Sequence, residues 1–106
     1  MANYLLAYHG GGGMADTEEE RGRIMAAWGQ WFQELGSALV DGGNPVGRSV
    51  TVDAGGSVVE GGGPNPVSGY SVVQSDSLDA ATAMARGCPV LLGGGTIEVA
   101  ETFSVM

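Results

Sequence analysis

Residues 3–9 constrain the fold more than any other stretch, because both faces of the strand they predict are apolar. Alternating positions hold Tyr4, Leu6 and Tyr8 on one face, and Leu5 and Ala7 on the other. Strands with apolar side chains on both faces are typical of sheets that are covered on both sides. We therefore expect residues 3–9 to be a central strand with other parts of the protein packed against each face.

A long amphipathic helix is expected after the glycines at residues 10–13. Thr17 and Glu20 have the spacing of a capping box, which marks the beginning of the helix. Apolar residues then recur at steps of three or four: Ile24, Trp28, Trp31, Leu35 and Leu39. Gly36 predicts the end of the helix, because glycine readily adopts the left-handed conformation found there. An extension of the helix to Val40 is the alternative.

Residues 69–103 predict a strand, a second helix and a final strand. Alternating apolar residues indicate the two strands: Tyr70, Val72, Ile97 and Val99. Between the strands, Ser77 can cap a helix that Gly87 and Pro89 would end.

The middle of the chain predicts a β-hairpin. Residues 46–53 alternate valines with polar residues, and residues 57–60 continue after a glycine-bearing loop. The order of elements is then β, α, β, β, α, β, which is the ferredoxin-like plan of the α+β class. This plan has a four-stranded antiparallel sheet with two helices on one face.

Two helices leave the second apolar face of the central strand uncovered. The chain has no further helix to place there, and a second copy is the economical answer. We therefore expect a homodimer in which two sheets pack face to face.

Composition excludes several classes of partner. The 106 residues are expected to form one domain, and the formal net charge of −8, with four arginines and no lysine, argues against a nucleic-acid partner. No apolar run is long enough for a membrane helix, so no membrane partner is expected. The chain begins without the pattern of a signal peptide, and the single cysteine, Cys88, fits a reducing compartment. We expect a cytoplasmic protein.

Segments spread over nearly the whole chain carry a family resemblance. They are residues 4–8 (YLLAY), 69–73 (GYSVV), 76–81 (DSLDAA), 87–89 (GCP) and 97–99 (IEV). Together they resemble the YCII-related family, and most closely its branch named for an Asp-Gly-Pro-Phe (DGPF) loop. The resemblance implies that residues 1–106 are a single YCII-like domain that forms a dimeric α+β barrel.

The chain departs from that branch in two places that bear on chemistry. Gly62, Gly63, Pro64 and Asn65 stand where the branch has Asp-Gly-Pro-Phe. Some relatives carry a histidine on the first helix, suggested as part of a His–Asp catalytic pair, whereas residues 17–40 contain none. The resemblance therefore implies a fold and an assembly, and leaves the reaction open.

His9, the only histidine, is the first candidate for chemistry. It ends the central strand beside a glycine-rich loop, where an imidazole could act as a general acid or base. Glu98 and Glu101 are its candidate partners, and they should point to opposite faces of the last strand. The alternatives are a histidine bonded to backbone or water, and glutamates that face solvent.

Other residues are candidates for contacts with a ligand. Gly63, Pro64 and Asn65 could form the rim of a pocket, and Trp28 and Trp31 could stack on a ligand or simply pack in the core. No cofactor is predicted, because residues 10–13 lack the lysine of a phosphate-binding loop. No metal site is predicted either, because no ligand spacing is recognised.

Two functions of different classes remain open. In the first, which we favour, the chain binds a small molecule or is an enzyme, with His9 as acid or base in a barrel pocket. In the second, it is a non-catalytic dimeric module that acts through protein contacts, for example in transcriptional regulation. The residues do not decide whether the chain is an enzyme.

Overall fold

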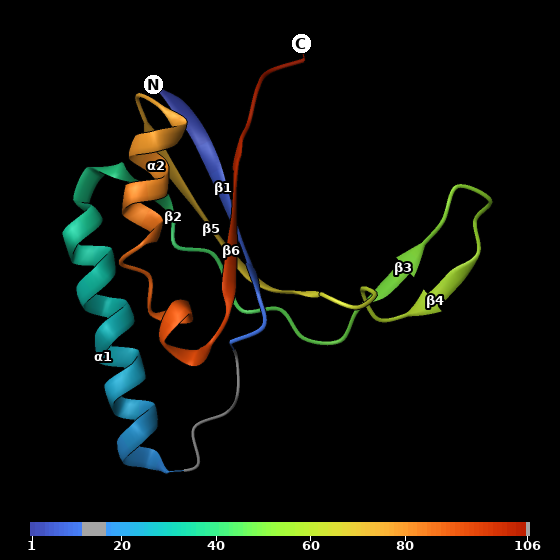
Figure 1. The fold of residues 1–106 in the computed structure, drawn as a ribbon, viewed down its shortest axis with the longest axis horizontal. Coiled ribbons are helices and arrows are strands. Elements are labelled where there is room, and N and C mark those ends of the chain that lie inside the picture. Colours follow the sequence, from blue (N-terminus) through green and yellow to red (C-terminus); the bar gives the residue numbers. More distant parts are fainter. Residues whose placement is uncertain (12–16, 106) are drawn as a thin grey trace.

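The computed structural model describes residues 1–11 and 17–105 (Figure 1). Its helices and strands follow in the order β1 (Ala2–His9), α1 (Glu18–Leu35), the 3₁₀ helix η1 (Gly36–Ala38), β2 (Leu39–Asp41), β3 (Val50–Val52), β4 (Val58–Glu60), β5 (Val67–Ser75), α2 (Leu78–Ala85), the 3₁₀ helix η2 (Pro89–Gly93) and β6 (Thr96–Glu101). Two α-helices, a four-stranded sheet and a two-stranded sheet make this described part of the chain an α+β fold. The glycines at 12 and 13 lie outside the described residues.

The four-stranded sheet has the order β2-β5-β1-β6, and each neighbouring pair is antiparallel. Strand β1 therefore lies between β5 and β6, as the apolar residues on both of its faces predict. Leu6, for example, lies opposite Ser71 on one side and Val99 on the other.

The two α-helices lie on the same side of this sheet (Figure 1). On that side the core contains the larger buried residues Tyr4, Leu6, Tyr8, Trp31 and Val73. The ring of Trp28 meets Tyr8 edge-on, with centroids 5.5 Å apart. Aromatic packing of this kind adds to the hydrophobic burial that holds α1 on the sheet.

The helix boundaries follow the capping residues that the sequence predicts. The Thr17 side chain accepts a hydrogen bond from the backbone N–H of Glu20 at 3.1 Å. Gly36 ends α1 with a φ of 55°, a conformation that glycine adopts without strain. The alternative in which the helix extends to Val40 is wrong, because Leu39–Asp41 forms strand β2. The Ser77 side chain caps α2 through the N–H of Ala80, at 3.1 Å.

The expected hairpin is present, but it is shorter than expected and lies outside the four-stranded sheet. Strands β3 and β4 pair only with each other. The place beside β5 is taken by β2, and the chain between β2 and β3 reaches β5 through an isolated bridge from Pro45 to Gly69 and through backbone hydrogen bonds of Asn44 and Val46. Alternating valines predict a hairpin, but they do not specify which strands it joins.

We call residues 46–66, which carry β3 and β4, the arm. In Figure 1 the arm stands away from the four-stranded sheet, on the side opposite the helices. The extents of 43 × 42 × 18 Å reflect this projection, as does the radius of gyration of 15.1 Å. A compact chain of this length would have a radius of gyration of about 13 Å.

We call the side of the four-stranded sheet opposite the helices the open face. Paired positions place apolar side chains across its middle: Leu5, Val72 and Ala100 in one row, and Ala7 and Tyr70 in the next. These side chains are half-buried or exposed, and no helix of residues 1–11 or 17–105 covers them (Figure 1). Nor is any helix in these two ranges long and apolar enough to cross a membrane.

Candidate functional site

His9 lies at the end of β1, on the open face of the sheet. Its neighbour Tyr8 points to the helix side, so the alternation of the strand places His9 on the opposite side. The pairing of β1 with β5 is irregular here, because Tyr8 lies opposite Gly69 whereas His9 lies opposite Val67. Irregularities of this kind bend a strand and redirect its side chains, and they are frequent beside active sites.

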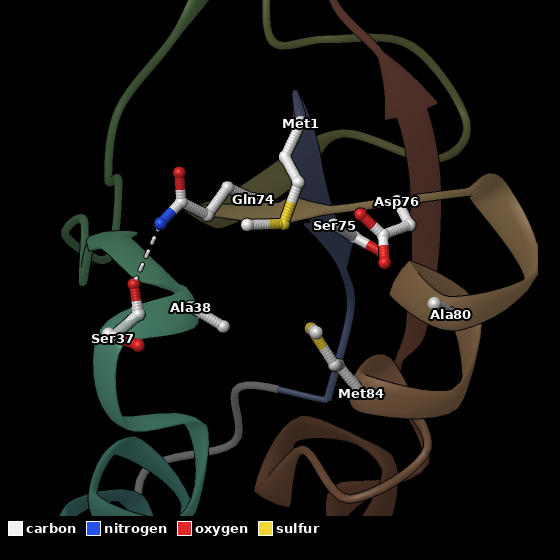
Figure 2. Close-up of a pocket in the computed structure, with 8 residues that line it drawn as sticks. All are labelled: Met1, Ser37, Ala38, Gln74, Ser75, Asp76, Ala80 and Met84. Carbon is white, nitrogen blue, oxygen red and sulfur yellow. Dashed lines mark hydrogen bonds between the residues drawn. The ribbon is translucent and has the colours of Figure 1, made fainter.

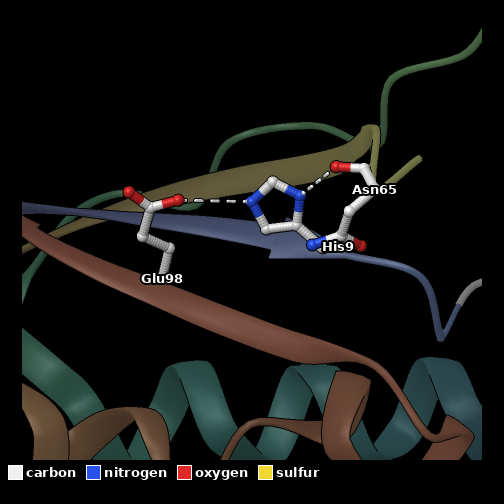
Figure 3. Close-up of polar contacts among 3 residues, drawn as sticks. All are labelled: His9, Asn65 and Glu98. Carbon is white, nitrogen blue, oxygen red and sulfur yellow. Dashed lines mark hydrogen bonds and ion pairs between the residues drawn. The ribbon is translucent and has the colours of Figure 1, made fainter. Parts of the chain in front are cut away.

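Both ring nitrogens of His9 have polar partners (Figure 3). Nδ1 is 2.9 Å from the backbone carbonyl oxygen of Asn65, and Nε2 is 3.5 Å from Oε1 of Glu98. A carbonyl oxygen can only accept a hydrogen bond, so Nδ1 carries a proton. In the neutral ring Nε2 is then the basic atom, and in the charged ring it faces the carboxylate as a donor. This arrangement can hold or release one proton at Nε2.

The pair of His9 and Glu98 is open to solvent on one side. The His9 side chain is 17% exposed, whereas the Glu98 side chain is 71% exposed. Water and salt weaken an ion pair in this setting, so the attraction between the two groups is modest in a single chain. Enclosing the pair would strengthen it, because the attraction rises as the local dielectric constant falls.

The turn predicted as a pocket rim contributes through its backbone. Asn65 orients the imidazole with its main-chain carbonyl group. Gly63 and Pro64 are exposed in the same turn. The sequence pointed to this turn as a rim, but a backbone contact leaves no signal in the side-chain pattern.

Glu101 is separated from His9. It lies opposite Tyr4, near the far end of β1, and it is three residues from Glu98 along β6, or about 10 Å. An odd number of positions places it on the other face of the sheet. Burial raises the pKa of Tyr4, and the negative charges of Glu101 and Asp76 raise it further. Of the two glutamates named as partners, the structure brings only Glu98 to His9.

Trp28 and Trp31 lie on the helix side, across the sheet from His9. Trp31 is 3% exposed, and its indole N–H donates to the backbone carbonyl of Met84 at 3.0 Å. Trp28 packs between Tyr8 and Trp31, with centroid distances of 5.5 and 5.7 Å. The structure thus shows core packing for both rings and does not place them with His9.

A buried series of hydrogen bonds on the helix side begins at Tyr8, the residue before His9. The sequence pattern did not predict it. The hydroxyl of Tyr8 donates to Oγ of Ser71 at 2.7 Å, and Ser71 donates in turn to the carbonyl of Gly42 at 2.7 Å. Burial raises the pKa of the Tyr8 hydroxyl, and burial likewise raises the pKa of the nearby Cys88 thiol. The only signal in the sequence is Ser71 itself, a polar residue in an otherwise apolar stretch of strand.

Two hollows in the described part of the chain lie away from His9. One, of about 180 Å³, lies between η1, α2 and the end of β5, and the side chains of Met1 and Met84 project into it (Figure 2). Gln74 closes one side by donating to the carbonyl of Ser37 at 3.0 Å. This hollow adjoins the beginning of β1, whereas His9 ends that strand. The residues around His9 therefore form a surface site.

In comparisons with known proteins, no family model and no curated protein matches this chain. The resemblance to the YCII-related family therefore stays a prediction, and the function has to be argued from the site.

Proposed function

We propose that this protein is a homodimer that binds a small molecule, with His9 as the acid or base of the site and Glu98 as its partner. The observation that carries the proposal is that both ring nitrogens of His9 have polar partners on the open face. A backbone carbonyl that accepts from Nδ1–H fixes the tautomer and leaves Nε2 as the basic atom, and a nearby carboxylate favours the protonated ring.

The finer fold and the assembly belong to the same proposal. The strand order β2-β5-β1-β6, with both α-helices on one face, supports a ferredoxin-like plan. The half-exposed apolar rows around Leu5 and Tyr70 support a second copy on the open face, which would make a dimeric α+β barrel. Such a dimer would enclose His9 and Glu98, and the resemblance to the YCII-related family implies the same assembly.

In this proposal Nε2 of His9 takes a proton from the bound molecule or returns one to it. The Asn65 carbonyl keeps the ring oriented, and Glu98 stabilises the imidazolium that forms when the proton is taken. Leu5, Ala7 and Val72 offer an apolar wall beside the pair. A ligand with an apolar body and one exchangeable proton fits this surface best.

Three substitutions to glutamine test the site. His9→Gln removes the acid or base, Glu98→Gln removes the partner charge, and Glu101→Gln is the matched control on the same strand and the opposite face. We expect native mass spectra of the freshly purified wild type and of Glu101→Gln to show a dimer with a bound small molecule. His9→Gln and Glu98→Gln should show the dimer without it. A wild-type dimer that carries no ligand, or equal retention in all variants, would contradict the binding function.

A second measurement tests the geometry without any ligand. His9 is the only histidine, so its ring nitrogens give unambiguous signals in a long-range ¹H–¹⁵N spectrum. The neutral ring should carry its proton on Nδ1, because the carbonyl of Asn65 accepts there. A ring protonated on Nε2 alone would refute the arrangement on which the proposed chemistry depends.

The alternative function is a non-catalytic dimeric module that acts through protein contacts. The exposed valines of the arm favour it, because exposed apolar side chains grouped together mark contact surfaces. The ligand-free dimer described above is the result that this alternative expects.

A further inference from the structure

One face of the hairpin in the arm carries three exposed valines. The pairing of Val50 with Glu60 and of Val52 with Val58 places these side chains on one face of the hairpin. Val59, paired with Thr51, lies on the other face. All residues of β3 and β4 are exposed, so the face with three valines has no cover in the described part of the chain.

The hairpin of the arm is fully formed although no other described residue covers its valine face. At its tip, the Asp53 side chain accepts hydrogen bonds from the N–H groups of Gly55 and Ser57, both at 2.9 Å. At its base, the N–H of Gly61 donates to the carbonyl of Ser49 at 2.8 Å. An isolated two-stranded hairpin is at best marginally stable in water. A hairpin with defined turns and a bare apolar face therefore indicates a partner that holds it.

The position of the arm indicates what that partner is. Its base is tied to the His9 end of the sheet, where the N–H of Val46 donates to the carbonyl of Ser68 at 3.1 Å and Asn65 meets His9. From there the arm projects on the side of the open face (Figure 1). The open face and the arm thus form two walls of one L-shaped surface. A second copy placed on the open face would lie directly against the arm.

The size of the open face supports the same partner. With strands about 4.8 Å apart and about 3.3 Å per residue, strands of the lengths seen here give the open face a footprint of roughly 400 Å². Stable interfaces bury about 800 Å² on each partner. The footprint of the sheet is smaller than this area, and the valine face of the arm offers further exposed apolar surface to the same partner.

Charge is compatible with a second copy. The chain carries a net charge of −8, so two copies repel each other unless their contact surface is nearly neutral. On the valine face of the arm, Glu60 is paired with Arg48 at 2.9 Å. On the open face, Glu98 lies 3.5 Å from His9, which offsets its charge when the imidazole is protonated.

We propose that the face of the arm formed by Val50, Val52 and Val58 packs on a second copy of this chain, so that each arm holds the partner. In a two-fold dimer the contact is reciprocal, and two arms contribute equally. The inference rests on the homodimer of the proposed function and adds the surface that holds it together. Because Asn65 lies near the end of the arm, where the chain returns to the sheet, docking of the arm also steadies the backbone that orients His9.

The test compares two substitutions on opposite faces of the hairpin. Val52 and Val59 are both 63% exposed, so in a single chain Val52→Asp and Val59→Asp are equivalent. We expect Val52→Asp to raise the dimer dissociation constant at least thirtyfold in sedimentation equilibrium, and Val59→Asp to change it less than threefold. Tryptophan fluorescence confirms the fold of each variant, since both tryptophans belong to α1, which lies on the other side of the sheet from the arm (Figure 1).

A third variant separates the arm from the sheet. Leu5→Asp changes the open face and should weaken the dimer whether or not the arm takes part. If Leu5→Asp weakens the dimer and Val52→Asp does not, the arm inference is overturned and the proposed homodimer stands. Equal effects of Val52→Asp and Val59→Asp would also overturn it. A wild type that is monomeric at all concentrations would overturn the homodimer and the arm together.

Discussion

Ser71 connects the buried Tyr8 to the half-buried Gly42, and its removal should cost more stability than its size suggests. The side chain is fully buried and bridges the hydroxyl of Tyr8 and the carbonyl of Gly42, each at 2.7 Å. Ser71→Ala leaves both groups without this partner. An unsatisfied buried polar group costs about 1 to 3 kcal/mol, and Gly42 is only half-buried. We therefore expect the free energy of unfolding to fall by about 2 to 4 kcal/mol.

Tyr8→Phe should be milder, because Ser71 can still donate to Gly42. The loss of one net hydrogen bond is worth about 1 kcal/mol, and the phenyl ring keeps its contact with Trp28. In the double variant, which combines Ser71→Ala with Tyr8→Phe, only the carbonyl of Gly42 loses its partner, because the tyrosine hydroxyl is gone. Its cost should therefore be about 2 kcal/mol, well below the sum of the two single changes.

Urea unfolding followed by tryptophan fluorescence measures all three variants, at one fixed protein concentration. Thermal unfolding is a second measurement, in which a difference of 1 kcal/mol in the free energy of unfolding shifts the melting temperature by about 4 to 8 °C for a chain of this size. If Ser71→Ala costs no more than Tyr8→Phe, or if the two costs simply add, the bridging role of Ser71 is refuted.

Three further changes test other parts of the structure. Gly43→Ala should lower the free energy of unfolding by more than about 1 kcal/mol in urea unfolding, because φ is +72° and a Cβ would collide with the carbonyl oxygen of Tyr70. Gly29→Ala should raise it by about 0.8 to 1 kcal/mol, since no described atom outside the backbone of α1 lies within 4 Å of the added methyl group; a loss would show that a partner occupies that space. Burial raises the pKa values of Cys88 and Tyr8, so the folded state keeps these protons longer than the unfolded chain. The contribution of these two groups to the free energy of unfolding should be fully present below pH 9.0, the ordinary pKa of the thiol. It should fall at higher pH, first because Cys88 loses its proton in the unfolded chain and, above pH 10.0, because Tyr8 does so too. Unfolding curves from pH 8 to 11 should show Cys88→Ala delaying this loss, and a flat profile in the wild type would contradict it.

The helix boundaries and the central strand could be predicted because their causes are local. Thr17, Gly36 and Ser77 act on backbone groups within a few residues, and the apolar alternation of β1 is visible without knowing its neighbours. These local signals did not decide whether α1 ends at Gly36 or extends to Val40. Leu39 continues the helical spacing, and only its pairing with Val73 shows that it belongs to a strand.

The candidate site could be predicted in part. His9 was distinguished by being the only histidine, at the end of a central strand, and alternation placed Glu98 and Glu101 on opposite faces. Which glutamate meets His9 depends on the register between β1 and β6, where Ala7 lies opposite Glu98. The backbone contact of Asn65 depends on where the chain returns from the arm.

The order of residues along this chain determined its helix ends, its central strand, its hairpin turn and the few side chains able to carry chemistry. These features depend on interactions between residues that are close in sequence. The tertiary structure decided that the hairpin stands outside the sheet, that Glu98 and not Glu101 meets His9, and that Trp28 and Trp31 pack on the far side. Each of these depends on strand register and on packing between distant segments, because a shift of one residue in a strand exchanges its two faces.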